Sequence, residues 1–429
     1  MRRLRMSLPP HHPRDPVGWC AAIALSFLAL VCFRLGIPSK PYFDEIHYLP
    51  AARALLAGSD WLNREHPMFG KEVIAAGIGL FGDHAWSWRL PSALAGALAL
   101  WASMRALWFA SLRRFATLAY GVLLATGFIL FVHARIAMLD GFMIAALAVA
   151  FWQCAAAVRQ PEHGRLSLAI AGVALGLALG TKWNAIPVAP LPGLAFAAAR
   201  LHANGWRGLF GHRGAPVPGI RLGEAAIWLG LVPLAVYALT YLPAYLIEPA
   251  ELGRRGFIGL HEMMLRMQES VIKPHPYQST WTDWVIDRRA IWYLYEPADG
   301  AQRGVLLIGN PLTMLLGLPA MLWCAWAAWA KRRVDALAVV VLYAASLGMW
   351  IVAAKPIQFY YHYFLPSMAL LAGLALALDA LRARGWGWLA WTVLAGSIAV
   401  FVWFHPILDA APLDGPRAFE HWMWLRSWR

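Results

Sequence analysis

Charged residues are scarce in this chain of 429 residues, because Asp, Glu, Lys and Arg together make up only 14% of it. Soluble domains carry about 25% charged residues, so the composition argues against a soluble protein. Hydrophobic residues make up 60% of the sequence and gather in long apolar stretches. The dyad alternation of a transmembrane β-barrel is also missing. The sequence therefore predicts an all-α polytopic membrane protein.

Cysteine is equally rare, and its positions exclude two kinds of site. The four cysteines all lie in apolar segments, and no CxxC or Cys/His spacing links them. This pattern indicates neither a metal site nor a disulfide framework. We interpret the four residues as small buried hydrophobic side chains. They are Cys20, Cys32, Cys154 and Cys324.

Eleven apolar segments are long enough to be predicted as transmembrane spans. We expect the first to remain as an uncleaved helix, because no small-residue cleavage site follows it. Every second connection is rich in Lys and Arg, beginning with Arg2, Arg3 and Arg5 before the first span. The N-terminus is therefore expected in the cytoplasm and the C-terminus outside. The predicted spans are about 18–37, 89–110, 115–133, 136–157, 166–181, 185–200, 223–247, 304–330, 335–354, 363–381 and 387–405.

Two connections on the outside are long, at 38–88 and 248–303. In the first, apolar residues recur at helical spacing and predict an amphipathic helix lying on the bilayer. A second such helix is expected to begin near Phe69. The second connection is rich in Tyr and Trp, which favour the membrane interface. The helical pattern of the first connection is formed by Tyr48, Ala51, Ala52, Leu55 and Leu56.

Two adjacent carboxylates, Asp44 and Glu45, follow the first span. Ionisable groups at the edge of the apolar layer are costly and usually functional. A carboxylate beside a bound hydroxyl can act as a general base. The alternative for both acids is an N-cap and first-turn role in the next helix.

Isolated Lys and Arg residues also occur on the outside, where they are unexpected because positively charged connections favour the cytoplasm. They could converge on an anionic lipid phosphate, or their side chains could extend to the lipid headgroups. With the carboxylates, the first reading indicates transfer of a group from a lipid phosphate to a hydroxyl. We expect Asp140 to pair with Arg135 across about one helical turn. The cations are Arg89, Arg135, Lys182 and Lys355.

Seven short blocks occur in order between residues 42 and 366. They are Phe43-Asp44-Glu45-Ile46-His47, His66-Pro67-Met68-Phe69-Gly70-Lys71, Arg135-Ile136-Ala137-Met138-Leu139-Asp140, Gly176-Leu177-Ala178-Leu179-Gly180-Thr181-Lys182-Trp183, His275-Pro276-Tyr277-Gln278-Ser279 with Trp281 and Trp284, Gly309-Asn310-Pro311, and Phe359-Tyr360-Tyr361-His362-Tyr363-Phe364-Leu365-Pro366. Their content and order resemble the protein O-mannosyltransferase family of the GT-C superfamily. The resemblance implies a GT-C fold with about 11 transmembrane helices and two long periplasmic loops.

The resemblance also implies a reaction: inverting transfer of mannose from a polyprenyl phosphate to a Ser or Thr hydroxyl of a protein. The site would lie on the periplasmic face of a bacterial inner membrane. Asp44 or Glu45 would be the catalytic base, and Arg89, Arg135 and Lys182 would bind the donor phosphate. Candidates for an acceptor or loop site are Glu65, His66, Lys71, His275, Tyr277, Trp281 and His362.

The blocks depart from the family pattern in places. Met68 replaces a proline, and Glu65 is the only acid near His66. The second loop, at 248–303, is too short for the β-trefoil domain of eukaryotic members. We therefore expect a compact bacterial-type enzyme, with a catalytic domain over 1–405 and a short periplasmic tail over 406–429.

Two alternatives are carried forward. The acceptor could be lipid A, a glycan or another envelope lipid, with the same class of donor. A transporter or flippase is more remote, because the charges cluster at the outer ends of spans and no halves repeat. We expect partners in the donor lipid, the acceptor and membrane lipids, and none in nucleic acid. No required cofactor is expected, and a divalent cation on Asp44 and Glu45 is left open.

Overall fold

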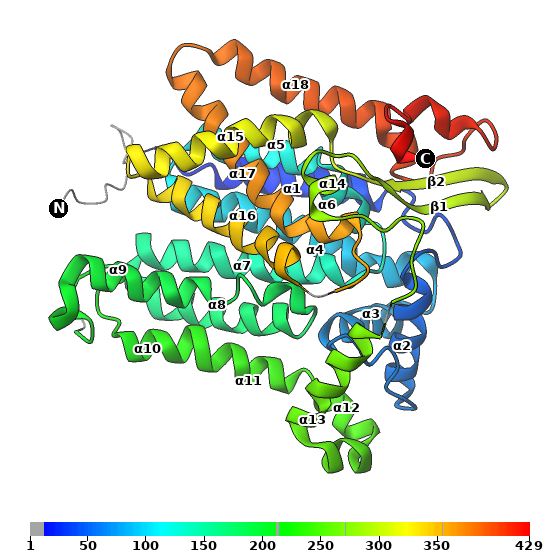
Figure 1. Cartoon of the computed structure of the whole chain (residues 1–429), viewed down its shortest axis with the longest axis horizontal. Helices are drawn as coiled ribbons and strands as arrows, with labels where there is room; N and C mark the ends of the chain where they lie inside the picture. The colour runs from blue at the N-terminus through cyan, green and yellow to red at the C-terminus, as the bar shows by residue number, and fades with distance from the viewer. Residues whose placement is uncertain (1–12, 212–213, 271, 354) are drawn as a thin grey trace.

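The computed structural model describes residues 13–211, 214–270, 272–353 and 355–429. Arg2, Arg3 and Arg5, which contribute to the predicted orientation, lie outside these described residues. Figure 1 shows a bundle of helices with smaller helices and a β-hairpin gathered at one end.

Eight helical segments of the described chain are long and apolar enough to cross a membrane. Three other predicted spans correspond to the shorter apolar helices α1 and α5, and to α9. The fold is therefore a multi-pass helical membrane protein with eight candidate spans, and the count of eleven stays a prediction. The bounds are α1 (Val17–Cys32), α4 (Ala85–Ser111), α5 (Arg114–Ala125), α6 (Phe128–His133), α7 (Leu139–Arg159), α8 (Gly164–Leu179), α9 (Leu191–Gly208), α10 (Leu222–Ala226), η3 (Ile227–Leu231), α11 (Val232–Leu239), α12 (Leu242–Ile247), α15 (Pro311–Ala330), α16 (Val334–Val352), α17 (Phe364–Ala383) and α18 (Gly387–Phe404).

Close helix packing explains the glycine-rich block that ends at Lys182. A Cβ atom at Gly172 would lie 2.0 Å from the carbonyl oxygen of Trp228, and one at Gly176 would lie 2.6 Å from that of Pro233. Small residues allow helices to approach in this way inside a membrane. The block therefore fixes α8 against the helices of residues 222–247, and with it the position of Lys182 at the end of α8.

The two long connections meet at one end of the bundle, which we call the site end (Figure 1). The first forms α2 (Glu45–Ala57) and α3 (Phe69–Phe81), which pack together and confirm the two predicted helices. The second forms α13 (Pro249–Glu269), α14 (Trp281–Val285) and the β-hairpin. Arg64 and Glu248 join the two connections with an N···O distance of 2.5 Å.

The second connection also contains a β-hairpin that the sequence did not predict, while the fold class remains all-α. Strands β1 (Ile291–Ala298) and β2 (Ala301–Leu307) pair in an antiparallel register from Ala298↔Ala301 to Ile291↔Leu307. The tip, Asp299-Gly300, has positive φ at both residues, as a two-residue type I′ turn requires. The span predicted at 304–330 was therefore wrong at its start, since residues 304–307 belong to β2 and α15 begins at Pro311.

Ion pairs join several basic connections at the other end of the bundle. Arg113 pairs with Asp379 at 2.8 Å, and Arg333 pairs with Asp335 at 2.5 Å. Arg113 lies between α4 and α5, and Arg333 lies between α15 and α16. Asp335 is in the first turn of α16, and Asp379 is near the end of α17. The predicted basic connections therefore gather opposite the site end, as alternating spans require.

The tail predicted over 406–429 packs against the hairpin. The Trp428 side chain is 2% exposed, and its Nε1–H donates to the carbonyl oxygen of Asp287 at 2.8 Å. Trp292 of β1 donates from Nε1 to the carbonyl oxygen of Trp428 at 3.2 Å. The tail is thus part of the folded site end.

Candidate active site at the end of the helix bundle

Glu45, in the first turn of α2, is fully buried and fully engaged. Its Oε1 accepts hydrogen bonds from Arg89 Nε at 2.8 Å and from the backbone N–H of Ala137 at 2.9 Å. Its Oε2 accepts from Arg89 Nη2 at 2.8 Å and from the backbone N–H of Tyr42 at 3.2 Å. A buried carboxylate needs such partners, and here they join three segments of the chain.

Arg89 is as completely engaged as its partner. The guanidinium is 0% exposed, and its N–H groups donate to Glu45 and to the carbonyl oxygens of Leu35, Pro38 and Lys40. Five donor bonds match the five N–H groups of an arginine. In this arrangement Arg89 offers no free N–H to the donor phosphate that the sequence assigned to it.

The Asp44 side chain differs from that of Glu45 in its burial and in its hydrogen bonds. It occupies the N-cap position of α2, yet its side chain makes no capping bond. The residue is half-buried, and none of the described residues donates a hydrogen bond to its carboxylate. Burial and the nearby carboxylate of Asp140 raise the pKa of Asp44, while Lys182 opposes the increase.

The residue before Asp44 is held in an unusual conformation. Phe43 has φ 49°, in the left-handed region that costs a non-glycine residue about 1–2 kcal/mol. Its ring stacks on that of Tyr293 in β1, with centroids 3.8 Å apart. The hairpin therefore helps to hold the turn that leads into Asp44 and the first turn of α2.

The expected pairing of Asp140 with Arg135 is wrong. Asp140 pairs with Lys182, whose Nζ lies 2.7 Å from Oδ2, and both residues are buried. Arg135 donates instead to the carbonyl oxygens of Val31 and Phe33 at 2.6 and 2.7 Å. These carbonyls end α1 and lack helical partners, so Arg135 caps that helix.

Lys355 is the second cation near Asp44. It follows α16, is half-buried, and lies within electrostatic range of Asp44, Asp140 and Lys182. Burial and the neighbouring charge of Lys182 lower the pKa of Lys355 to about 8. Lys355 and Lys182, the latter paired with Asp140, thus bring two positive charges into electrostatic range of the free Asp44 carboxylate.

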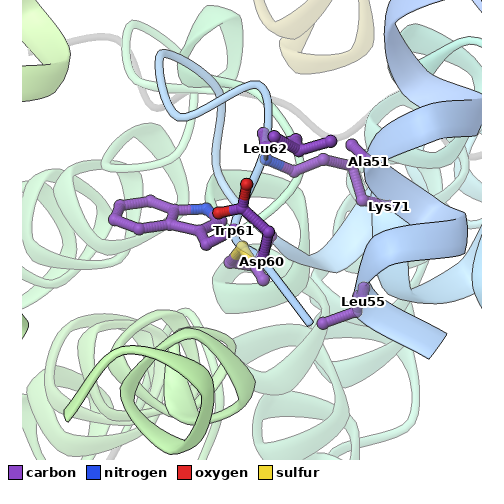
Figure 2. A pocket seen from close by; sticks show the side chains of 7 residues that line it. Ala51, Leu55, Asp60, Trp61, Leu62 and Lys71 are labelled. Carbon is purple, nitrogen blue, oxygen red and sulfur yellow. Dashed lines mark hydrogen bonds between the residues drawn. The ribbon is translucent and has the colours of Figure 1, made fainter. Parts of the chain in front are cut away.

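The loop between α2 and α3 carries the first group of acceptor candidates. Lys71 is 1% exposed, and its Nζ donates to the carbonyl oxygens of Leu62, Asn63 and His66 at 3.3, 2.8 and 3.0 Å. Figure 2 shows Lys71 at a small pocket, which Asp60 and Trp61 also line. Lys71 therefore stabilises the loop that contains Glu65 and His66.

The His66 ring packs edge-on against Tyr48 of α2, with centroids 6.0 Å apart. Burial and the cations Lys182 and Lys355 lower its pKa well below the usual value, which keeps the imidazole neutral. Glu65 accepts a hydrogen bond from Asn63 at 2.7 Å, and its backbone carbonyl accepts one from Gln268 of α13 at 2.8 Å.

The second loop brings the remaining candidates to the same end. The Ser279 N–H donates to the carbonyl oxygen of Gln358 at 2.9 Å, and this bond ties the block His275–Trp284 to the segment before α17. The ring centroids of His275 and Phe359 lie 5.1 Å apart, and those of Trp284 and His362 lie 5.8 Å apart. Tyr277 and Trp281 lie in the same block and are partly buried.

Sequence reasoning missed two aromatic residues that complete the site. Tyr361 lies below Lys182, with Nζ 5.0 Å from the ring centroid, and its ring meets Phe43 at 6.1 Å. Tyr293 packs on Phe43 from the hairpin. Both were visible only as part of aromatic-rich blocks. In the part of the chain that the structure describes, no group of three or more His, Cys, Asp or Glu could hold a metal ion.

Comparison with known proteins gives a consistent result. A family model for dolichyl-phosphate-mannose-protein mannosyltransferase matches residues 37–245, and a model for the C-terminal four TMM region of protein-O-mannosyltransferase matches residues 254–428. The polyprenol-phosphate-mannose–protein mannosyltransferase of Mycobacterium tuberculosis is 28% identical, over 96% of this chain and 92% of that protein. Its counterpart in Mycolicibacterium smegmatis is 26% identical, over 98% and 95%.

Solved structures share the fold at lower identity. A chain of the S. cerevisiae protein O-mannosyltransferase Pmt1-Pmt2 complex, bound to the sugar donor, matches with a TM-score of 0.80 at 13% identity, over 96% of this chain and 92% of that one. ArnT from Cupriavidus metallidurans, bound to undecaprenyl phosphate, matches with a TM-score of 0.57 at 19% identity, over 90% and 64%.

Proposed function

This chain belongs to the protein O-mannosyltransferase family, and we propose that it transfers mannose from a polyprenyl phosphate to a Ser or Thr hydroxyl of a protein. The donor and the protein acceptor follow from the names of the mycobacterial relatives, which align over nearly the whole chain. The enzyme is thus a polyprenyl-phosphate-mannose-dependent glycosyltransferase. The observation that carries the assignment of the site is the free carboxylate of Asp44 beside two cations.

Asp44 is the general base of this proposal. A carboxylate without hydrogen-bond partners can accept the proton of an incoming hydroxyl, and burial makes it more basic than an exposed aspartate. The hydroxyl oxygen bonds to the anomeric carbon as the bond from that carbon to the phosphate oxygen breaks. Attack from the face opposite the leaving phosphate inverts the anomeric centre.

Lys182 and Lys355 stabilise the leaving phosphate. Its charge increases as the glycosidic bond breaks, and cations fixed in a water-poor site stabilise that charge more strongly than water does. Arg89 and Arg135 are positioning residues in this account. The first binds Glu45 and the loop before it, and the second caps α1.

The site end faces the periplasm of a bacterial inner membrane in this proposal. The basic connections between spans gather at the opposite end, and positive connections favour the cytoplasm. The donor lipid and the acceptor would then both reach Asp44 from the outer leaflet.

Transfer of labelled mannose from a defined polyprenyl phosphate to a Ser/Thr peptide, with purified protein, tests the proposal. We expect a peptide product with the anomeric configuration inverted relative to the donor. A second arm offers lipid A, a glycan or envelope lipids in place of the peptide. Label in that arm alone would overturn the protein acceptor, and label in neither arm with an intact donor would overturn the transfer reaction.

A further inference from the structure

His362 is a buried side chain with one nitrogen that has no partner. The residue is 2% exposed, and its Nδ1 accepts a hydrogen bond from the backbone N–H of Phe359 at 3.0 Å. Among the described residues, none forms a hydrogen bond with its Nε2. The proposed reaction does not yet use this group.

The bond to Phe359 fixes the tautomer of the ring. A nitrogen that accepts a backbone N–H carries no proton of its own, so the proton of neutral His362 lies on Nε2. The orphan atom is therefore an N–H donor. A buried donor without a hydrogen bond is unfavourable, so a ligand that accepts this hydrogen bond recovers the loss.

The surroundings of His362 favour an anion as that ligand. The charged side chains that act most strongly on the ring are Lys355 and Lys182, and both carry positive charge. The ring centroids of Tyr361 and His362 lie 4.4 Å apart. The Nζ of Lys182 lies 5.0 Å from the centroid of the same Tyr361 ring. Trp350 lies against the imidazole with centroids 3.9 Å apart.

We propose that His362 Nε2–H donates a hydrogen bond to a non-bridging oxygen of the donor phosphate. Lys182 and Lys355 supply the charge, and His362 supplies a directed donor in a position fixed by Phe359 and Trp350. This inference rests on the proposed function and extends it. It moves His362 from the acceptor or loop group predicted from the sequence to the donor site.

A phosphate fits this set of groups better than a sugar hydroxyl does. A hydroxyl both donates and accepts, so its binding sites usually contain an acceptor as well. His362 Nε2–H and the two ammonium groups are all donors. Phosphate oxygens only accept, and their charge strengthens each bond.

Two substitutions separate the donor role from the structural role. His362→Asn places a carbonyl oxygen near the position of Nδ1, so it keeps the bond from Phe359 and loses the distal N–H. His362→Gln places an amide N–H near the position of Nε2. His421→Asn, at an exposed histidine near the C-terminus, is the matched control.

Binding of polyprenyl phosphate, measured without transfer, is the readout. We expect His362→Asn to bind about 10–100-fold more weakly, His362→Gln to stay within about 5-fold of wild type, and neutral polyprenol to bind all variants alike. Inorganic phosphate as a competitor shows whether the site binds phosphate apart from its lipid. Equal binding by wild type and His362→Asn would overturn this inference alone. No binding by wild type would overturn the proposed function instead.

Discussion

At the scale of single residues, two adjacent acids differ in their hydrogen bonds. The sequence singled out Asp44 and Glu45 as candidates, but it could not predict which carboxylate is free. That difference depends on Arg89 and Ala137, which bond Glu45 from 44 and 92 positions away. No local pattern reports such contacts. The same is true of Asp140, whose partner Lys182 is 42 positions away and not one helical turn away.

The engaged acid should matter chiefly for stability. Glu45→Gln leaves the Arg89 charge buried without its counterion, and breaking a buried pair in this way costs about 3–5 kcal/mol. We expect a clearly lower Tm in detergent. Glu296→Gln, at an exposed pair, is the control. An unchanged Tm for Glu45→Gln would contradict this assignment.

The pH dependence of kcat/KM should have two limbs. The base must be ionised, so activity falls as the pH falls through the raised pKa of Asp44. Lys355 must be charged to bind the phosphate, so activity also falls as the pH rises through about 8. Lys355→Arg should move the alkaline limb upward, because a guanidinium stays charged. An alkaline limb that does not move would exclude Lys355 from phosphate binding.

At the scale of elements, helix positions followed from apolar periodicity and their close packing did not. The sequence predicted α2, α3 and the transmembrane helices, because each has a clear apolar pattern. It missed the hairpin, since the apolar strand β2 is short and precedes α15 closely enough to look like its first turn. The glycines of α8 became meaningful only once the carbonyls facing them were known.

A methyl group on α8 should disturb the site from a distance. Gly176→Ala places a Cβ 2.6 Å from the carbonyl oxygen of Pro233, and overpacking of this kind costs about 1–3 kcal/mol. We expect a lower Tm and weaker donor binding, because Lys182 lies three residues beyond the end of α8. Gly230→Ala is the control, since nothing lies within 4 Å of its added Cβ. If both variants behaved like wild type, the contact between α8 and the helices of residues 222–247 would not be close-packed.

At the scale of the whole molecule, distant segments meet at one end of a membrane bundle. The alternation of basic connections predicted that both long loops share a face, and hydrogen bonds and ion pairs join them there. The order of the short blocks predicted the family. The geometry of the site could not be predicted, because it combines side chains from α2, α8, the hairpin and the segment before α17.

Labelling of single cysteines tests the orientation. In a cysteine-free background, Asp414→Cys lies at the site end, and Arg384→Cys follows α17 at the other end, and both positions are exposed. A membrane-impermeant maleimide should label Asp414→Cys in intact spheroplasts and Arg384→Cys only after lysis. The reverse pattern would place the active site in the cytoplasm.

The proposed role of Asp44 is that of the base that activates the acceptor hydroxyl. Its most direct test is single-turnover mannosyl transfer by Asp44→Asn with donor bound at saturation, beside the control Asp83→Asn at an exposed aspartate. We expect Asp44→Asn to lose about 10²–10⁴-fold in rate while its Tm and its binding of polyprenyl phosphate stay close to wild type. Transfer at the wild-type rate by Asp44→Asn would contradict it.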